Sequence, residues 1–257
     1  MNFKPFKQCR ACPRLKKSGP TNGYYYDYID GKLMTIECDC HKKWVKENNL
    51  IKKYIESKVD VDLDWDSYRG KRSISSLDKL KIISNNPENA VSQAMFYLYG
   101  PNSCQKTSMA KVLGKKLIDS GKSVFFTTMN EVINNIKPDF NEKNEDRIAQ
   151  KNNILDKITN CDFLIIDESF DRDKFNVAKS GYEISFLDTF LRTRFETNHK
   201  SIMFISNKSP KEIESQGFGT SIQSLVERNT QYTLLRFEDN YRLNEPNPKN
   251  FWEDCEV

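Results

Sequence analysis

The residues Gly100-Pro-Asn-Ser-Cys-Gln-Lys106-Thr107 form a short segment whose composition and spacing suit the binding of phosphate. They follow an apolar run, precede a helical pattern, and fit the phosphate-binding loop GxxxxGK[ST] at all but one position. In such a loop the backbone N–H groups and the helix N-terminus bind anionic oxygens. Lys106 is expected to reach the β- and γ-phosphates of a nucleotide, and the Thr107 hydroxyl to hold Mg²⁺. The predicted cradle consists of Gly100, Pro101, Asn102, Ser103, Cys104, Gln105, Lys106, Thr107 and Ser108.

Gln105 is the departure from this pattern, because it stands where the loop has glycine. A side chain there can restrict the backbone torsions or crowd the phosphates. Two other interpretations therefore stay open beside an active site. The loop could bind nucleotide and hydrolyse it poorly, or the Lys-Thr pair could follow a strand by coincidence.

Two adjacent carboxylates end the apolar run FLIIDE at 163–168. At the end of a buried strand, Asp167 can hold Mg²⁺ in the manner of a Walker-B acid. Glu168 beside it can orient and polarise an attacking water molecule. The alternative for the pair is a solvated turn at the end of the strand.

Asn207 and Arg228 are the remaining candidates for the same chemistry. Asn207 ends the run SIMFISN, which is expected to form a neighbouring strand, so its amide could position the same water; an Asx turn is the alternative. Arg228 lies too far along the chain to belong to the same loop. Supplied by a neighbouring subunit, it could stabilise the charge of the γ-phosphate, and otherwise it is an ordinary surface arginine.

Four cysteines near the N-terminus form a plausible zinc site. Cys9 and Cys12 are separated by two residues, and Cys38 and Cys40 follow 25 residues later, with His41 next to them. Two ligand pairs of this kind can hold one Zn²⁺ and stabilise a segment too small to fold alone. We expect four sulfur ligands, with His41 as an alternative for Cys38 or Cys40; free thiols in a turn-rich arm are the other interpretation.

Composition limits the class of protein. Of 257 residues, 37% are hydrophobic, which suffices for one full core and a small accessory module. No apolar run approaches the roughly 18 residues that span a membrane, and the start, MNFKPFKQCRACPRLKK, lacks the apolar stretch of a secretory signal. These features argue against a membrane, secreted or disordered protein and favour a cytoplasmic one. Residues 1–60 carry 13 Lys/Arg against 7 Asp/Glu, which mildly favours an acidic partner.

The elements that must position these residues can be predicted from the pattern. A hairpin around Asp30-Gly31 and a helix near 43–57 are expected in an N-terminal module, residues 1–60, followed by a polar linker, 61–75. In residues 76–257 apolar runs alternate with helical patterns, which predicts an α/β domain with a mostly parallel sheet covered on both faces. Such sheets bind ligands at the carboxyl ends of their strands. The five expected strands are 96–101, 123–128, 163–168, 201–207 and 232–237.

Together GPNSCQKT, LIIDE, FISN and the LVER segment, followed by FEDNYR, resemble the AAA+ ATPases that load bacterial replicative helicases, the DnaC/DnaI-like family. The resemblance covers roughly residues 62–245. It implies that Lys106 and Thr107 bind nucleotide and Mg²⁺, Asp167 and Glu168 form Walker B, Asn207 is the first sensor and Arg228 is an arginine finger. Arg194 matches an arginine found before the sensor strand, and Arg242 is a weaker candidate for a second sensor.

The resemblance also extends to the N-terminal module. Some loaders of Gram-positive bacteria and their phages carry an N-terminal zinc-binding domain that binds the helicase, and residues 1–41 look like a shorter version of it. Tyr24, Tyr25 and Tyr26, beside basic residues, could instead stack on bases, although tyrosines in a two-stranded ribbon more often pack over a metal site.

The expected function is that of an ATP-dependent helicase loader, of phage or mobile-element origin, that acts on single-stranded DNA. Its expected cofactors are ATP, Mg²⁺ and Zn²⁺, and it is expected to self-associate through its ATP sites. Two alternatives stay open. One is a related ATPase that assists transposition, and the other is a weakly hydrolysing adaptor or inhibitor of replication proteins, which Gln105 would favour.

Overall fold

The structure is a computed structural model that describes residues 23–69, 75–137, 144–172 and 181–238. The predictions for Cys9, Cys12 and Arg242 lie outside these residues. The chain divides into two compact units, residues 1–60 and 61–257, which we describe separately.

The N-terminal unit contains a hairpin and a helix, as its sequence pattern predicts. Strands β1 (Tyr24–Ile29) and β2 (Lys32–Glu37) pair antiparallel. Asp30 and Gly31 connect them with φ values of 50° and 76°, the left-handed conformation that a two-residue hairpin turn requires. The helix α1 (Asp39–Glu56) follows directly after Cys38.

The second unit is built on the predicted parallel sheet. Its strands are β3 (Met95–Tyr99), β4 (Val124–Thr128), β5 (Phe163–Asp167), β6 (Ser201–Ser206) and the short β7 (Leu234–Arg236). All neighbouring pairs run parallel, in the order β4-β5-β6-β3-β7. Because β6 lies between β5 and β3, the ends of these three strands meet at one edge of the sheet.

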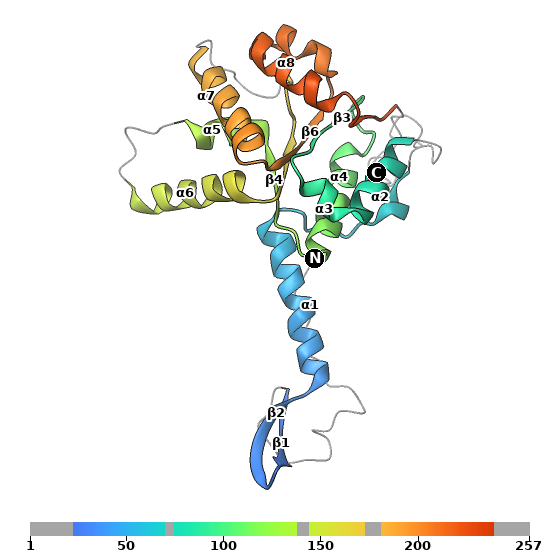
Figure 1. Ribbon diagram of the computed structural model, residues 1–257, viewed down its shortest axis with the longest axis vertical. Helices are drawn as coiled ribbons and strands as arrows, with labels where there is room; N and C mark the ends of the chain where they lie inside the picture. The colour runs from blue at the N-terminus through green and yellow to red at the C-terminus, as the bar shows by residue number, and fades with distance from the viewer. Residues whose placement is uncertain (1–22, 70–74, 138–143, 173–180, 239–257) are drawn as a thin grey trace, which may run out of the picture. The chain divides into compact units, whose positions relative to one another are not determined.

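Helices cover both faces of this sheet (Figure 1). The helices α4 (Lys106–Asp119), α2 (Ser75–Asn85) and α3 (Pro87–Val91) gather on one side. On the other side lie α5 (Met129–Ile136), α6 (Glu145–Asn160), α7 (Gly181–Arg192) and α8 (Gly219–Thr230). Short helical turns complete the unit: η2 (Trp65–Ser67), η4 (Thr193–Thr197), η5 (Pro210–Glu212) and η6 (Glu214–Phe218).

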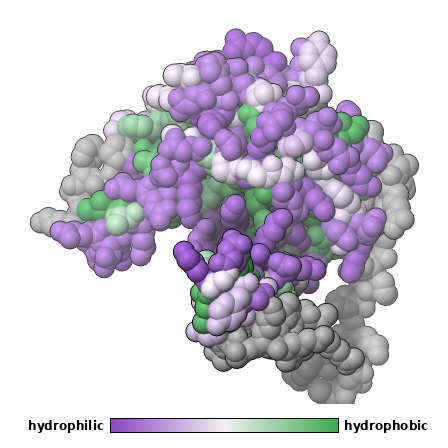
Figure 2. Space-filling model, turned by 60° about the horizontal axis from the view of Figure 1, so that its bottom comes forward, coloured by the Kyte–Doolittle hydropathy of each residue, from purple (hydrophilic) through white to green (hydrophobic). Residues whose placement is uncertain are grey.

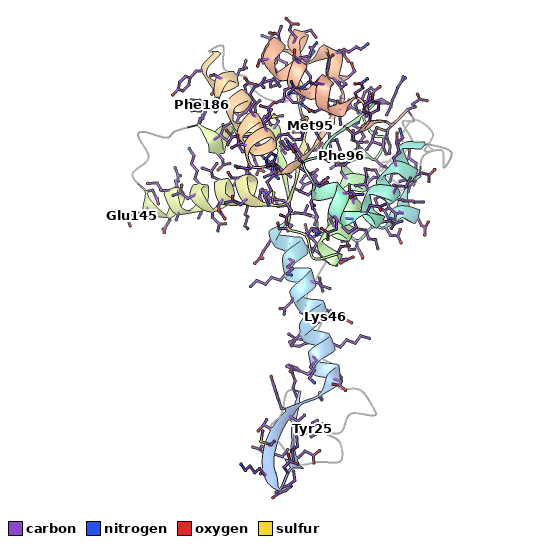
Figure 3. All side chains as sticks on the ribbon, in the orientation of Figure 1. Tyr25, Lys46, Met95, Phe96, Glu145 and Phe186 are labelled. Atoms are coloured by element: carbon purple, nitrogen blue, oxygen red, sulfur yellow. The ribbon has the colours of Figure 1, made fainter. Side chains whose placement is uncertain are left out.

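The strands read as continuous apolar runs because both of their faces are buried. Successive side chains alternate between the faces. Met95 and Phe96 are neighbours on β3 (Figure 3). Met95 belongs to the core beneath α5 to α8. The ring of Phe96 instead lies 5.7 Å from the ring of Phe163, and neither of these two residues is part of that core. The sheet is thereby fixed from both sides, and its loop-bearing edge is a rigid base for a site.

The surface shown in Figure 2 is mostly hydrophilic, with only small separate hydrophobic areas. None of the helices in the described part of the chain is long and apolar enough to cross a membrane.

Candidate nucleotide-binding site

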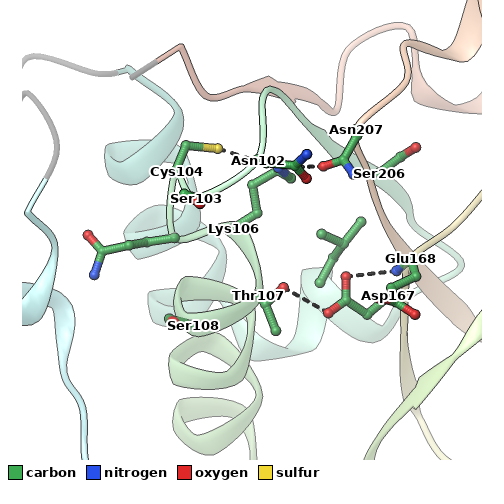
Figure 4. Close-up of a pocket in the computed structure, with 12 residues that line it drawn as sticks. Asn102, Ser103, Cys104, Lys106, Thr107, Ser108, Asp167, Glu168, Ser206 and Asn207 are labelled. Atoms are coloured by element: carbon green, nitrogen blue, oxygen red, sulfur yellow. Dashed lines mark hydrogen bonds between the residues drawn. The ribbon is translucent and has the colours of Figure 1, made fainter. Parts of the chain in front are cut away.

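A cavity of about 380 Å³ lies where β3, β5 and β6 end (Figure 4). Three separate segments of the sequence form its walls, namely the predicted phosphate loop, the Asp-Glu pair after β5 and the residues that end β6. Its volume falls in the range of small-molecule sites. The lining residues are Asn102, Ser103, Cys104, Gln105, Lys106, Thr107, Ser108, Asp167, Glu168, Ile205, Ser206 and Asn207.

Gly100 opens the loop at a position that only glycine can occupy. Its φ is 151°, and a Cβ there would collide with the backbone carbonyl oxygen of Phe237, just after β7. The first glycine of the motif therefore lets β3 and the end of β7 approach closely. Helix α4 begins five residues beyond Pro101, so its N-terminal N–H groups and positive dipole end are at the cavity.

Gln105 adopts the left-handed conformation that the motif glycine would supply, with φ 62° and ψ 19°. For a residue with a side chain this conformation costs on the order of 1–2 kcal/mol. Its side-chain oxygen accepts a hydrogen bond from the Arg69 backbone N–H at 2.6 Å, and its amide nitrogen donates to the Ser67 carbonyl at 3.2 Å. Each bond contributes about 0.5–1.5 kcal/mol, so together they can offset the backbone cost. The substitution thus leaves the loop conformation intact.

Lys106 is 7% exposed, and its ammonium group is surrounded by oxygen acceptors. It donates to the carbonyls of Gly100 at 2.9 Å and Pro101 at 2.7 Å, and to the side-chain oxygen of Asn207 at 3.2 Å. Cys104 Sγ lies 3.4 Å from the same nitrogen, so four acceptors share its three N–H donors. The loop and the end of β6 thus hold the ammonium at the cavity wall, where an anionic ligand would meet it.

Thr107 and Asp167 bring two hard oxygen donors together. The Thr107 hydroxyl donates to Asp167 Oδ2 at 2.7 Å (Figure 4). Burial raises the pKa of Asp167, although the hydrogen bond from Thr107 and the nearby Lys106 oppose this. Asp167 Oδ1 also accepts from the backbone N–H of Glu168, whose φ of 52° turns the chain sharply at the cavity. The donor set fits Mg²⁺, which prefers carboxylate and hydroxyl oxygens.

Asn207 lies directly after β6, the strand next to β5, rather than on the strand itself. Besides accepting from Lys106, its amide nitrogen donates to Asp171 Oδ2 at 3.3 Å. Asp171 is a buried carboxylate that the sequence analysis missed. It lies four residues after Asp167 in the stretch DESFD. A third acidic residue so close to the Asp-Glu pair was the sequence signal that could have identified it.

Arg194 lies away from the lining residues and is 1% exposed. Its guanidinium donates to four backbone carbonyls, at distances of 2.8–3.0 Å, from Ile158, Thr159, Cys161 and Ser201. Burial lowers the pKa of Arg194, with Cys161 opposing. Arg194 thus connects the C-terminal end of α6 to the start of β6, and its role is structural.

Arg228 lies at the surface of α8, outside the lining residues of the cavity. Its side chain is 69% exposed and pairs with Glu196 at 3.0 Å.

Tyr68 and Trp65, which precede the core, do not line the cavity either. Tyr68 is buried with its ring edge-on to Phe237, at 5.7 Å between centroids.

In the N-terminal unit the sulfurs of Cys38 and Cys40 lie 3.0 Å apart. His41 Nδ1 is 2.6 Å from Glu37 Oε1, and the His41 ring fills the space where Gly23 would carry a Cβ. Within the described ranges, no three His, Cys, Asp or Glu side chains are grouped to hold a metal ion. Half of the expected cysteine set thus lies together, and the other half falls outside those ranges.

The family can be decided by comparison with known sequences. Residues 21–221 match the family described as IstB-like ATP binding protein. The chain belongs to this family. The match includes the phosphate loop, the Asp167-Glu168 pair and Asn207, and it ends before Arg228. Membership of the IstB-like family implies that the chain binds ATP, and it agrees with the resemblance to DnaC/DnaI-like AAA+ proteins noted from the motifs.

Curated relatives of this IstB-like chain are replication proteins. The chain is 35% identical over 75 residues to the replicative helicase loader DnaC of Buchnera aphidicola subsp. Baizongia pistaciae, covering 29% of each chain. It is 28% identical over 117 residues to the chromosomal replication initiator protein DnaA of Helicobacter hepaticus, covering 46% of this chain and 23% of that protein. The matches thus span about a quarter of these relatives' lengths.

The fold has a solved counterpart. A structure of the replication initiator DnaA bound to AMPPCP and single-stranded DNA superposes with a TM-score of 0.51. The two chains are 15% identical, and the alignment covers 72% of this chain and 56% of that one. This likeness shows the fold alone, an α/β domain built on a five-stranded parallel sheet.

Proposed function

We propose that this IstB-like protein is an ATPase that binds a replicative DNA helicase and helps to place it on single-stranded DNA, in bacterial or phage DNA replication in the cytoplasm. The observation that carries the ATPase part is the convergence of Lys106, Thr107, Asp167 and Asn207 on one cavity. They come from three separate parts of the sequence and meet only in the folded chain.

The chemistry follows from these positions. The loop N–H groups and Lys106 bind the β- and γ-phosphates, and this places the terminal phosphorus close to Glu168 and Asn207. Thr107 and Asp167 would hold Mg²⁺, and the ion would supply positive charge that neutralises the phosphate oxygens. Glu168 orients the attacking water and accepts its proton, while the Asn207 amide fixes the direction of attack.

Arg228 completes the site from a neighbouring protomer in this proposal. Arg228 is exposed and pairs with Glu196 at the surface, which leaves its guanidinium at a face that another copy can reach. A positive charge placed there in trans would stabilise the charge of the γ-phosphoryl group during transfer. ATP bound between protomers would thereby control self-association.

The partners are inferred from the relatives. A DnaC helicase loader is among them, which supports a hexameric replicative helicase as the target. A solved fold relative is bound to single-stranded DNA, which supports that ligand.

We further propose that residues 1–60 bind the helicase through a module that holds one Zn²⁺. Cys38 and Cys40 would supply two sulfurs, with Cys9 and Cys12 as the second pair. His41 is the alternative ligand, and its Nδ1 contact with Glu37 is the outer-shell partner that a metal-bound imidazole commonly has. Tyr26 and Tyr28 share one face of the hairpin and are exposed, which suits a protein contact, whereas the Tyr24 ring lies 5.2 Å from the ring of His41 and packs beside the proposed metal site.

Elemental analysis of the protein purified without added zinc tests this module. We expect about one equivalent of Zn²⁺, and Cys38→Ser should lose it. Metal-free protein whose N-terminal unit resists proteolysis as well as the zinc-loaded form would refute the assignment.

Affinity purification from the native host tests the function itself. Glu168→Gln, which should retain ATP, is the bait, and Lys106→Ala is the matched control. We expect the bait with ATP to enrich a replicative helicase, and neither the bait with ADP nor the control to do so. A bait that enriches nothing in an ATP-sensitive way contradicts the loader proposal.

The second candidate is an ATPase that assists transposition, which the IstB-like family match itself favours. It predicts that the same bait enriches a transposase and duplex DNA. A third possibility, an adaptor that hydrolyses ATP weakly, was favoured by Gln105; the intact loop conformation at that residue weakens this argument.

A further inference from the structure

The nine residues Val61–Arg69, which we call the strap, run along α4 toward the phosphate loop. At one end Lys115 on α4 donates to the Val61 carbonyl at 3.3 Å, and at the other end Gln105, just before α4, binds Ser67 and Arg69. Ten helical residues rise about 15 Å, so the strap follows most of the helix. A polar linker was expected over 61–75, whereas this part of it is docked.

The strap has its own local structure. The turn η2 is closed by reciprocal hydrogen bonds: Asp64 Oδ1 accepts from the Ser67 N–H at 3.0 Å, and Ser67 Oγ accepts from the Asp64 N–H at 3.2 Å. This capping arrangement fixes the direction of the Ser67 carbonyl and the Arg69 N–H. The strap thus presents an acceptor and a donor, two residues apart, that a primary amide can bind together.

Gln105 uses both atoms of its amide for these two groups. A glycine at this position would permit the same backbone conformation but would make neither bond. The residue that departs from the loop motif is therefore also the residue that joins the loop to the strap.

The strap reaches the other end of the loop as well. Tyr68 is buried against the ring of Phe237. Phe237 donates its N–H to the Tyr99 carbonyl at 2.8 Å, and its own carbonyl takes the space beside Gly100 that a Cβ would fill. The strap is thus connected to the phosphate cradle at two places: directly at Gln105, and through Phe237 at Gly100, the first residue of the cradle.

We propose that Gln105 is a positioning residue that couples nucleotide occupancy of the phosphate loop to docking of the strap. The inference rests on the proposed nucleotide site. The torsions of Gln105 direct the N–H groups that bind phosphate, so a ligand that orders these groups also holds the side chain that binds Ser67 and Arg69. Coupling of two binding events is reciprocal, so a docked strap favours nucleotide and nucleotide favours a docked strap. Residues 1–60 are connected in sequence to the second unit through the strap. Docking of the strap would therefore make the segment that leads to the N-terminal unit depend on whether nucleotide is bound.

Hydrogen exchange of the Arg69 backbone amide in the full chain reports the strap directly, since this N–H is donated to Gln105. We compare wild type with Gln105→Gly, and with Gln105→Asn as the matched control. Asparagine tolerates the left-handed conformation but is one methylene too short to reach. Without nucleotide, we expect exchange in both variants to be about three- to tenfold faster than in wild type, the factor that one net hydrogen bond provides. Equal exchange rates of the Arg69 amide in wild type and both variants would show that Gln105 does not hold the strap.

The coupling is tested by adding Mg²⁺ and AMPPCP. Exchange at Arg69 should slow at least about threefold in wild type and should not change in either variant, a difference that a purely structural role of Gln105 would not produce. Slowing of equal size in all three proteins would refute the coupling. Calorimetric titration of wild type with AMPPCP separates the proposals. If it shows no binding, the proposed function and the coupling both fail, while the nucleotide-free comparison still decides whether Gln105 holds the strap.

Discussion

Lys106 and Asp167 are ionisable side chains that the fold keeps largely away from water. Lys106 is satisfied by two loop carbonyls and Asn207, and Asp167 by Thr107 and the Glu168 N–H. These bonds hold both groups in place before any ligand arrives. A site arranged in this way loses little order when it binds, which is the advantage of preorganised charge in phosphoryl transfer.

Glu168→Gln separates binding from hydrolysis. The change removes the proton acceptor and keeps the shape of the side chain and the backbone turn. We expect ATP turnover to fall about 100-fold or more, the usual contribution of a general base, with ATP affinity within about threefold of wild type. Single-turnover hydrolysis and calorimetric binding measure the two quantities. Unchanged turnover would mean that another group activates the water.

At the scale of elements, two charged side chains join the start of the sheet to the end of α6. Arg194 donates to two carbonyls in the last turn of α6, to that of Cys161 just after the helix, and to that of Ser201 at the start of β6. Asp162, just before β5, accepts from the N–H and hydroxyl of Ser123 and from Lys200 at 2.7 Å. Three neighbouring strands are thus held in register at the edge opposite the cavity.

Arg194→Lys tests the structural role of the buried arginine. Lysine has three donors in place of the guanidinium fork, so at least one buried carbonyl loses its partner, at about 1–3 kcal/mol each. We expect the free energy of unfolding to fall by about 2–4 kcal/mol in urea titrations, with ATP affinity of the folded protein retained. Arg192→Lys, a partly exposed position on α7, should change stability by less than about 0.5 kcal/mol. Full stability with lost turnover would instead place Arg194 in the chemistry.

Asp162→Asn tests the contribution of Asp162 through the pH dependence of the free energy of unfolding. Partial burial raises the pKa of Asp162, but the bonds from Lys200 and Ser123 outweigh it and lower the pKa from 3.8 to about 2. A lowered carboxyl pKa stabilises the fold at every pH above the unfolded value, and this contribution fades as pH falls toward 2. We expect Asp162→Asn to cost about 1–2 kcal/mol at pH 7, after allowing for solvent screening, and progressively less below pH 4. A cost that is the same at pH 7 and pH 3 would be incompatible with this origin.

The elements were largely predictable from the sequence, and the partners of individual side chains were not. Apolar runs such as FLIIDE indicate buried strands, and the loop motif marks the turn from β3 into α4. The sequence showed that Gln105 departs from the motif, but its partners lie 36 and 38 residues earlier, and no local pattern connects them. Arg194 could be matched to a family position, yet its burial, which determines its task, is a property of packing.

At the scale of the whole molecule, the site is expected to be completed between copies. Arg228 and the cavity are parts of one chain, but no described contact brings them together. A site divided between protomers links ATP binding to assembly, which is the property a loader needs. The division also predicts how two inactive variants behave when mixed.

Mixing Glu168→Gln with Arg228→Ala tests the shared site. Each variant alone should hydrolyse ATP at least about tenfold more slowly than wild type. A mixed assembly contains interfaces with an intact Glu168 from one protomer and an intact Arg228 from the other. We therefore expect the mixture to recover part of the wild-type turnover, most at equal proportions. Activity that never exceeds the sum of the separate variants would show that Arg228 does not act across an interface.

The central claim is that a nucleoside triphosphate and its Mg²⁺ bind at the joined ends of β3, β5 and β6 through Lys106. Calorimetric titration with AMPPCP and Mg²⁺ tests it most directly, on wild type, Lys106→Ala and the control Lys116→Ala, which changes an exposed lysine on the same helix. The account predicts one site per chain in wild type and Lys116→Ala, and affinity lowered at least about 100-fold in Lys106→Ala. Equal affinity in all three proteins would contradict it.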